Sequence, residues 1–149
     1  MKIATLLLTF AACFFLPLAH AADKPAATST IEAVLVVASK APGKPDPRLA
    51  AYEATLRRVL RFESFQFLGR ARATLATPGE GSLDLGGGQR LDLKTEPAAD
   101  QRLRIQVSWF QGATALMDTG LLLRSGVPAV LGGPARGEGE VYAVILTGN

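Results

Sequence analysis

Apolar residues in this chain mostly follow the spacing of β-strands. Residues 31–39 are almost all apolar and rich in β-branched side chains, which is typical of a strand covered on both faces in the middle of a sheet. In residues 65–75 and 103–109, apolar and polar residues alternate. Each of these segments therefore predicts a strand of an antiparallel sheet with one buried face.

One segment follows a helical spacing instead, after the proline-rich loop of residues 40–47. Asp46 and Pro47 predict its start, because aspartate caps a first turn and proline is tolerated at the first helical position. The residues that form its apolar stripe are Leu49, Tyr52, Leu56, Val59 and Leu60. The helix is expected to approach the sheet closely over three small residues of the neighbouring strand, Gly69, Ala71 and Ala73.

Three consecutive glycines predict a β-hairpin over residues 83–93, since glycine supplies the positive φ angles of short hairpin loops. A three-residue loop, 86–88, places Asp84 opposite Arg90, which pairs opposite charges and sets the register. A five-residue loop would place Asp84 opposite Asp92, where two carboxylates could hold a cation or act as an acid/base pair. We expect the first register. The glycines join strand to strand, so they do not predict a phosphate-binding loop.

Further strands are expected after this hairpin, and their predicted ranges are 113–124, 127–131 and 141–147. The predicted turns lie at 125–126, 132–134 and 137–139. The whole pattern predicts an α+β domain, in which one helix packs on a mostly antiparallel sheet or sandwich of seven to eight strands.

The first 21 residues have the three parts of a secretory signal peptide. Lys2 gives the positive start, residues 3–18 the apolar stretch, and Ala19 and Ala21 the small residues before the cleavage site. The apolar stretch is shorter than the roughly 20 residues that span a bilayer. We therefore expect cleavage after Ala21 and a periplasmic or secreted protein with no membrane span. It would consist of a flexible tether and a single domain, over residues 22–30 and 31–149.

Cys13 allows an alternative, because Phe10 to Cys13 resembles a bacterial lipobox, in which Cys13 would carry a lipid anchor. Cleavage after Ala21, which we expect, would instead remove the only cysteine, Cys13, and the only histidine, His20. A domain without both cannot form a disulfide, a Cys/His metal site, a Ser-His-Asp triad or a thiol nucleophile. We therefore expect no metal and no cofactor.

Arginines supply the candidate binding residues. Seven of them would form one basic surface if the helix end and two of the strands are neighbours: Arg57, Arg58, Arg61, Arg70, Arg72, Arg102 and Arg104. Such a surface attracts an acidic polymer or an acidic protein, whereas arginines on a solvated sheet face need no partner. Nucleic acid is not expected, because the mature chain has a charge of only +2 and few aromatic residues for base stacking.

Two alternative functions depend on other residues. A carboxylate-dependent hydrolase of envelope glycans needs two acidic groups about 5–9.5 Å apart in one cleft. Its candidates are Asp84, Asp92, Asp118, Glu138 and Glu140. A carrier of a small apolar ligand would need a cavity lined by Phe65, Phe67, Trp109 and Leu121. We expect the aromatic residues to pack as a core cluster under the helix instead, formed by Phe62, Phe65, Phe67 and Trp109.

The C-terminal part has a pattern of apolar segments interrupted by glycines, from Leu121 to Pro134 and again from Val141 to Thr147. This pattern resembles the strand-turn-strand end of secretin domains from bacterial type II and type III secretion. The resemblance implies a role in envelope assembly or protein contact and transfers no site residues. The sequence thus favours an exported, non-catalytic β-rich module that binds another macromolecule, or acts as a scaffold, in the bacterial cell envelope.

Overall fold

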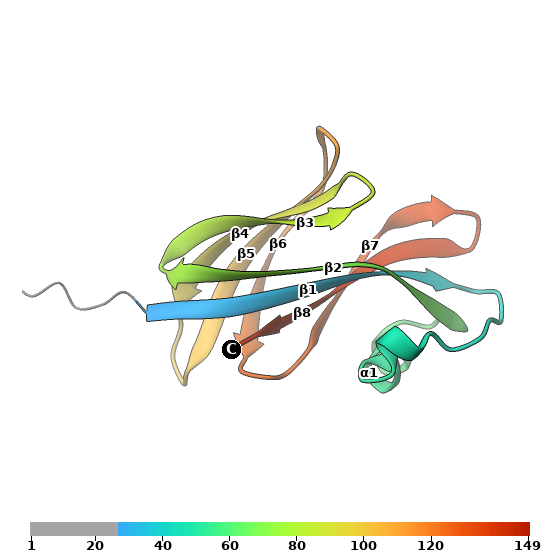
Figure 1. Cartoon of the computed structure of the whole chain (residues 1–149), viewed down its shortest axis with the longest axis horizontal. Coiled ribbons are helices and arrows are strands. Elements are labelled where there is room, and N and C mark those ends of the chain that lie inside the picture. The colour runs from blue at the N-terminus through green and yellow to red at the C-terminus, as the bar shows by residue number, and fades with distance from the viewer. Residues whose placement is uncertain (1–26) are drawn as a thin grey trace, which may run out of the picture.

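The computed structural model describes residues 27–149, which form two antiparallel sheets and a short helical segment (Figure 1). The elements are β1 (Ala27–Ser39), the 3₁₀ helix η1 (Pro47–Leu49), α1 (Glu53–Val59), β2 (Ser64–Thr77), β3 (Gly79–Gly86), β4 (Gln89–Pro97), β5 (Arg102–Gln111), β6 (Thr114–Arg124), β7 (Ala129–Gly137) and β8 (Glu140–Gly148). Sheet A has the order β2-β1-β8-β7 and sheet B the order β3-β4-β5-β6. This confirms a β-rich domain with one α-helix and eight antiparallel strands in the described residues.

β1 lies between two hydrophobic cores, because its alternate residues point to opposite sides of sheet A. The residues that point into the larger core, between the two sheets, are Ile31, Ala33 and Leu35. Those that point into the smaller core, under the helical segment, are Val34, Val36 and Ala38. β1 also has a hydrogen-bonded strand on each side, which confirms the prediction of a central strand covered on both faces.

The start of β1 corrects one predicted boundary. Residues 27–30, expected to belong to a flexible tether, pair with β2 from Thr77 to Thr74. The hydroxyls of Ser29 and Thr77 also share a hydrogen bond across the two strands, 3.1 Å long. The expected signal peptide, its cleavage at Ala21 and the alternative lipidation of Cys13 lie outside the described residues. Neither helix in residues 27–149 is long and apolar enough to cross a membrane.

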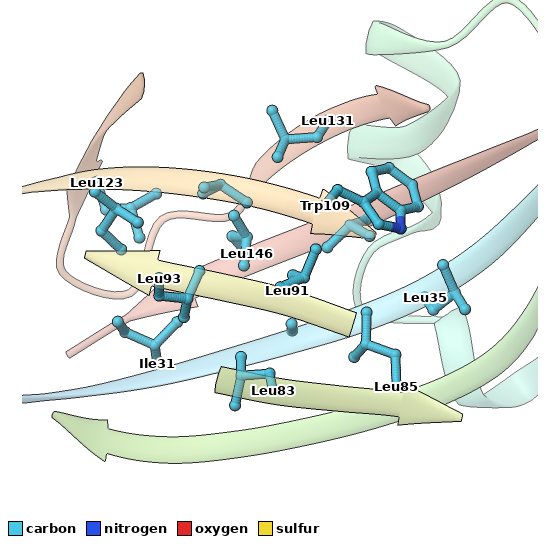
Figure 2. Packing of buried hydrophobic residues seen from close by; sticks show 14 of the residues in the cluster. Ile31, Leu35, Leu83, Leu85, Leu91, Leu93, Trp109, Leu123, Leu131 and Leu146 are labelled. Carbon is cyan, nitrogen blue, oxygen red and sulfur yellow. The ribbon is translucent and has the colours of Figure 1, made fainter. Parts of the chain in front are cut away.

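The larger core surrounds Trp109 of β5 (Figure 2). Trp109 is 0% exposed, and its Nε1–H donates to Oε1 of Gln89 over 2.7 Å. The alternating residues of β5 are buried from Leu103 to Trp109, as their spacing predicts. The prediction of one aromatic cluster under the helix was wrong for Trp109, since β5 belongs to the other sheet.

A β-bulge divides β2 between the two cores. Phe67 pairs with Val36 and Gly69 with Leu35, so Leu68 is an extra residue without a partner on β1. The extra residue reverses the faces of the strand. Phe65 and Phe67 pack under the helical segment together with Phe62, whereas Ala71, Ala73 and Leu75 pack between the sheets.

The predicted close approach of the helix over Gly69, Ala71 and Ala73 was therefore wrong. Gly69 lies against β3 instead, where an added Cβ would overlap the carbonyl oxygen of Leu85. The absence of a side chain at Gly69 thus brings the edge of sheet A onto the edge of sheet B.

The helical segment starts where the sequence predicts. Oδ1 of Asp46 accepts a hydrogen bond from the Arg48 amide over 3.0 Å, and Pro47 is the first residue of η1. The segment then forms two short helices rather than one continuous helix. Leu49 of η1 and Leu56 of α1 are both buried against the outer side of sheet A. Tyr52 and Leu60 also pack against this core, so four of the five residues of the predicted apolar stripe lie on it, and only Val59 is exposed.

The hairpin between β3 and β4 has the predicted register, with Asp84 opposite Arg90. Gly86, Gly87 and Gly88 have φ angles of 82°, 61° and 78°, as the turn requires. The prediction of a turn at 132–134 was wrong, because these residues lie within β7. The register of β7 shifts there, and Gly133 lies so close to the Trp109 ring that no side chain would fit.

Candidate functional site

Cations gather on the outer side of sheet A. Residues 40–72 contain eight Lys and Arg but only three Asp and Glu, and they form the helical segment and the first part of β2. Figure 1 shows α1 beside the end of β1 and the start of β2. We call the exposed cations of this side the helix-side surface, and they are Lys44, Arg48, Arg57, Arg58, Arg61, Arg70 and Arg72.

Two phenylalanine rings position three of these arginines. The Arg48 guanidinium carbon lies 4.6 Å from the centroid of the Phe67 ring, and that of Arg70 lies 5.9 Å from the same centroid. Arg57 lies 5.9 Å from the Phe65 centroid. A guanidinium within about 6 Å of a ring face is attracted by the ring quadrupole. The rings therefore bring cations of the helical segment and of β2 into one cluster.

Asp46 ties the helical segment to β2. Its Oδ2 accepts from Nη2 of Arg48 over 2.8 Å and from the Phe67 amide over 3.1 Å. The bonds to Arg48 and to the Phe67 amide hold the pKa of Asp46 well below its ordinary value. The carboxylate in turn raises the pKa of Arg48. The ion pair holds the Arg48 guanidinium over the Phe67 ring.

Glu32 of β1 faces two arginines at once. Its carboxylate lies 2.6 Å from Nη2 of Arg72 and 3.7 Å from Nε of Arg70, and it accepts a hydrogen bond from the Tyr52 hydroxyl over 3.4 Å. The Glu32 side chain is 15% exposed, while those of Arg70 and Arg72 are 47% and 68% exposed. One carboxylate thus orients two exposed guanidiniums without cancelling both charges.

An open hollow of about 550 Å³ lies at the edge of this cluster. Lys44, Arg48 and Phe67 line it together with Pro45, Asp46, Pro47 and Gln66. A guanidinium presents several N–H donors that match a carboxylate, sulfate or phosphate group. The hollow therefore offers Lys44, an aromatic ring and the Arg48 guanidinium to an anionic group of a larger molecule, although Arg48 already donates from Nε and Nη2 to Asp46.

The seven arginines predicted from the sequence do not form one surface. Arg57, Arg58, Arg61, Arg70 and Arg72 lie on the helix side of sheet A. Arg102 and Arg104 alternate with buried residues of β5, so they point outward from sheet B, away from sheet A. Arg102 also pairs with Asp100, at 3.3 Å.

The carboxylates proposed for a hydrolase lie in two places. Asp84, Asp92 and Asp118 are on sheet B, where Asp92 accepts from Ser82 and Arg90, and Asp118 accepts from Gln106. Glu138 and Glu140 are at the turn between β7 and β8. In residues 27–149, no group of three or more Asp, Glu, His or Cys could hold a metal ion.

The cavity required for an apolar-ligand carrier does not form. Phe65 and Phe67 pack under the helical segment, while Trp109 and Leu121 pack between the sheets, so sheet A separates the two pairs. A hollow of about 230 Å³ lies instead where the two sheets end, and it is lined by residues that include Ser29, Thr77, Leu103, Leu123 and Asn149.

The sequence interpretation missed the roles of Lys44, Arg48 and Glu32. The sequence signal for Arg48 was its place directly after the predicted helix start. No family model matches this chain, and no curated protein or solved structure is significantly similar to it. The resemblance to secretin domains therefore stays a prediction.

Proposed function

We propose that this chain is an exported, non-catalytic binding module of the bacterial cell envelope, which contacts an acidic macromolecule through the helix-side surface. The observation that carries the proposal is the excess of positive charge on the helix side of sheet A. Residues 40–72 carry a formal charge of +5, and Glu32 is the only other acidic group that the structure pairs with them within residues 27–149.

The geometry favours binding of an extended anionic chain over a reaction. The arginines are exposed and lie along an open surface. Four of them are held by an aromatic ring or a carboxylate before any partner arrives: Arg48, Arg57, Arg70 and Arg72. Positioned cations lose little side-chain entropy when they bind, which increases affinity. A partner with regularly spaced carboxylates or phosphates would contact several of these arginines at once.

The test compares two variants with the same change in formal charge. The first replaces Arg57, Arg58, Arg70 and Arg72 with Ser on the helix-side surface. The matched control replaces four cations of sheet B with Ser, namely Arg90, Lys94, Arg102 and Arg104. Binding to alginate, a polysaccharide with one carboxylate per sugar, is measured by isothermal titration calorimetry at several salt concentrations.

The proposal predicts salt-sensitive binding that the first variant loses and the control retains, because surface charge interactions are screened by salt. Equal losses in both variants would show that only net charge matters. Binding lost only in the control would place the site on sheet B. Each of these two results, and the absence of binding in the unsubstituted protein, would contradict the proposal.

A further inference from the structure

β6 is the least protected strand edge in residues 27–149. The edges of β2 and β3 cover each other, since Gly69 lies directly against Leu85. The edge strand β7 contains Pro134 and two irregularities in its pairing, both of which discourage strand addition. β6 ends sheet B, is 11 residues long and contains no proline. β6 has one bulge, at Leu116, but residues 117–124 pair with β5 without interruption. This uninterrupted part of the edge can pair with another strand.

The outward side of β6 carries an unbalanced charge. Arg124 is directly opposite Arg102 across β5 and β6, and like charges at directly opposite positions destabilise a sheet. Arg102 pairs with Asp100, but no acidic side chain of residues 27–149 lies within ion-pair distance of Arg124. Leu122 is 47% exposed on the same side of the strand. An added strand would lie beside the exposed Leu122, and a carboxylate of that strand opposite Arg124 would balance the arginine charge.

β6 itself is such a strand. Side chains alternate, so outward residues of an added copy must lie opposite outward residues of the first. An antiparallel pair centred on Leu121 places Asp118 of each copy opposite Arg124 of the other. The same register places Gly120 opposite Leu122. A pair centred on Gly120 places Asp118 opposite Leu122 instead. A pair centred on Leu122 places Arg124 opposite Gly120. Both of these registers lose the two ion pairs.

We propose that two copies of this chain associate through antiparallel pairing of their β6 strands, with the two-fold axis at Leu121. Sheet B then continues across the axis as one eight-stranded sheet, and the interface is the same patch on both copies. Because such an axis is perpendicular to the sheet, both helix-side surfaces face the same way. The proposal stands on the edge of β6 and does not depend on what the helix-side surface binds.

The first experiment exchanges charges and measures mass by sedimentation velocity. D118R places two arginines opposite each other in the pair, and R124D places two aspartates opposite each other. Each variant alone should dissociate at least about 10-fold more readily than the unsubstituted protein, because opposed like charges are strongly unfavourable at an interface. An equimolar mixture of the two should form heterodimers, since both ion pairs are then restored. E80R, on β3, is the charge control and should leave the dimer unchanged.

The second experiment uses cysteine pairs and does not depend on charge. Directly opposite residues of antiparallel strands lie about 4.5–5.5 Å apart, which a disulfide can bridge. L121C should therefore form an intermolecular disulfide under mild oxidation, while T119C, which lies opposite Leu123, should not. Both are made with Cys13 replaced by Ser, and circular dichroism confirms that every variant folds. A monomer at concentrations up to about 100 μM, or a D118R and R124D mixture that stays monomeric, would overturn the proposal.

Discussion

Substitution of Trp109 tests the description of the larger core most sharply. W109F removes part of a side chain that is 0% exposed, together with the donor of its 2.7 Å hydrogen bond to Gln89. The indole exceeds the phenyl ring by about 40 Å³, so incomplete collapse would cost about 1 kcal/mol. The buried Gln89 carbonyl oxygen, left without its donor, costs about 1–3 kcal/mol more. We expect W109F to lower the free energy of unfolding by about 2–4 kcal/mol.

A double-mutant cycle with Q89M separates the two costs. Nε2 of Gln89 is already buried without a partner within residues 27–149, so Q89M removes an unsatisfied group as well as the acceptor of Trp109. When both partners are apolar, nothing is left unsatisfied. The double variant should therefore be more stable than the sum of the single effects by about 1–3 kcal/mol. Urea unfolding followed by circular dichroism measures this coupling, because Trp109 is the only tryptophan and fluorescence would change with W109F. Additivity within about 0.5 kcal/mol would refute the reasoning.

Three further predictions concern the junction of the sheets and the helix-side surface. G69A should lower the free energy of unfolding by about 1–3 kcal/mol, because the new Cβ overlaps the Leu85 backbone, whereas G137A, where an added Cβ meets nothing within 4 Å, should change it little in urea unfolding. Folding lowers the pKa of Asp46, so its ionised carboxylate adds to the free energy of unfolding above about pH 4, and this addition is lost as the pH falls. In D46N the free energy of unfolding, measured by urea titrations at several pH values, should therefore fall less steeply below about pH 4. E32Q removes the carboxylate that orients two arginines but also adds one unit of positive charge to the surface. The charge gain should exceed the cost of the lost orientation, so calorimetry should show alginate bound more tightly.

The strands that the sequence predicted best are those with strict alternation. In β5, every second residue from Leu103 to Trp109 is buried, because the strand has one side on the core along its whole length. The hairpin of β3 and β4 was also predictable, since opposite charges and three positive-φ glycines favour the same register. In both cases, residues close together in the sequence determine the structure.

The features that the sequence did not predict depend on contacts between distant segments. The bulge at Leu68 reverses the faces of β2. Gly69 beside it is the only local sign, and a glycine inside a strand is equally typical of a close approach by another backbone. Gly132 and Gly133 have the composition of a turn, but they lie in β7 because Trp109 of the other sheet occupies the space beside Gly133. A glycine needed for close packing and a glycine needed for a turn are identical in the sequence.

The candidate surface was predictable only in part for the same reason. The sequence allowed a common surface only if the helix end and the strands are neighbours, and the structure places the arginines of the helical segment and of β2 on one side. Arg102 had the same alternating pattern as Arg70, but it belongs to the other sheet, and alternation does not identify the sheet. The stacking of Arg48 and Arg70 on Phe67 required the path of the chain from residue 48 to 70.

The most direct test of the central claim is to map where an acidic chain touches the protein. Amide chemical shifts of ¹⁵N-labelled protein would be followed by NMR during a titration with alginate oligosaccharides. If the helix-side surface binds the acidic chain, the largest shift changes will cluster at residues 44–48 and 57–72 and will disappear at high salt. Changes centred on the outward side of β4 and β5, or changes absent throughout the chain, would contradict this prediction.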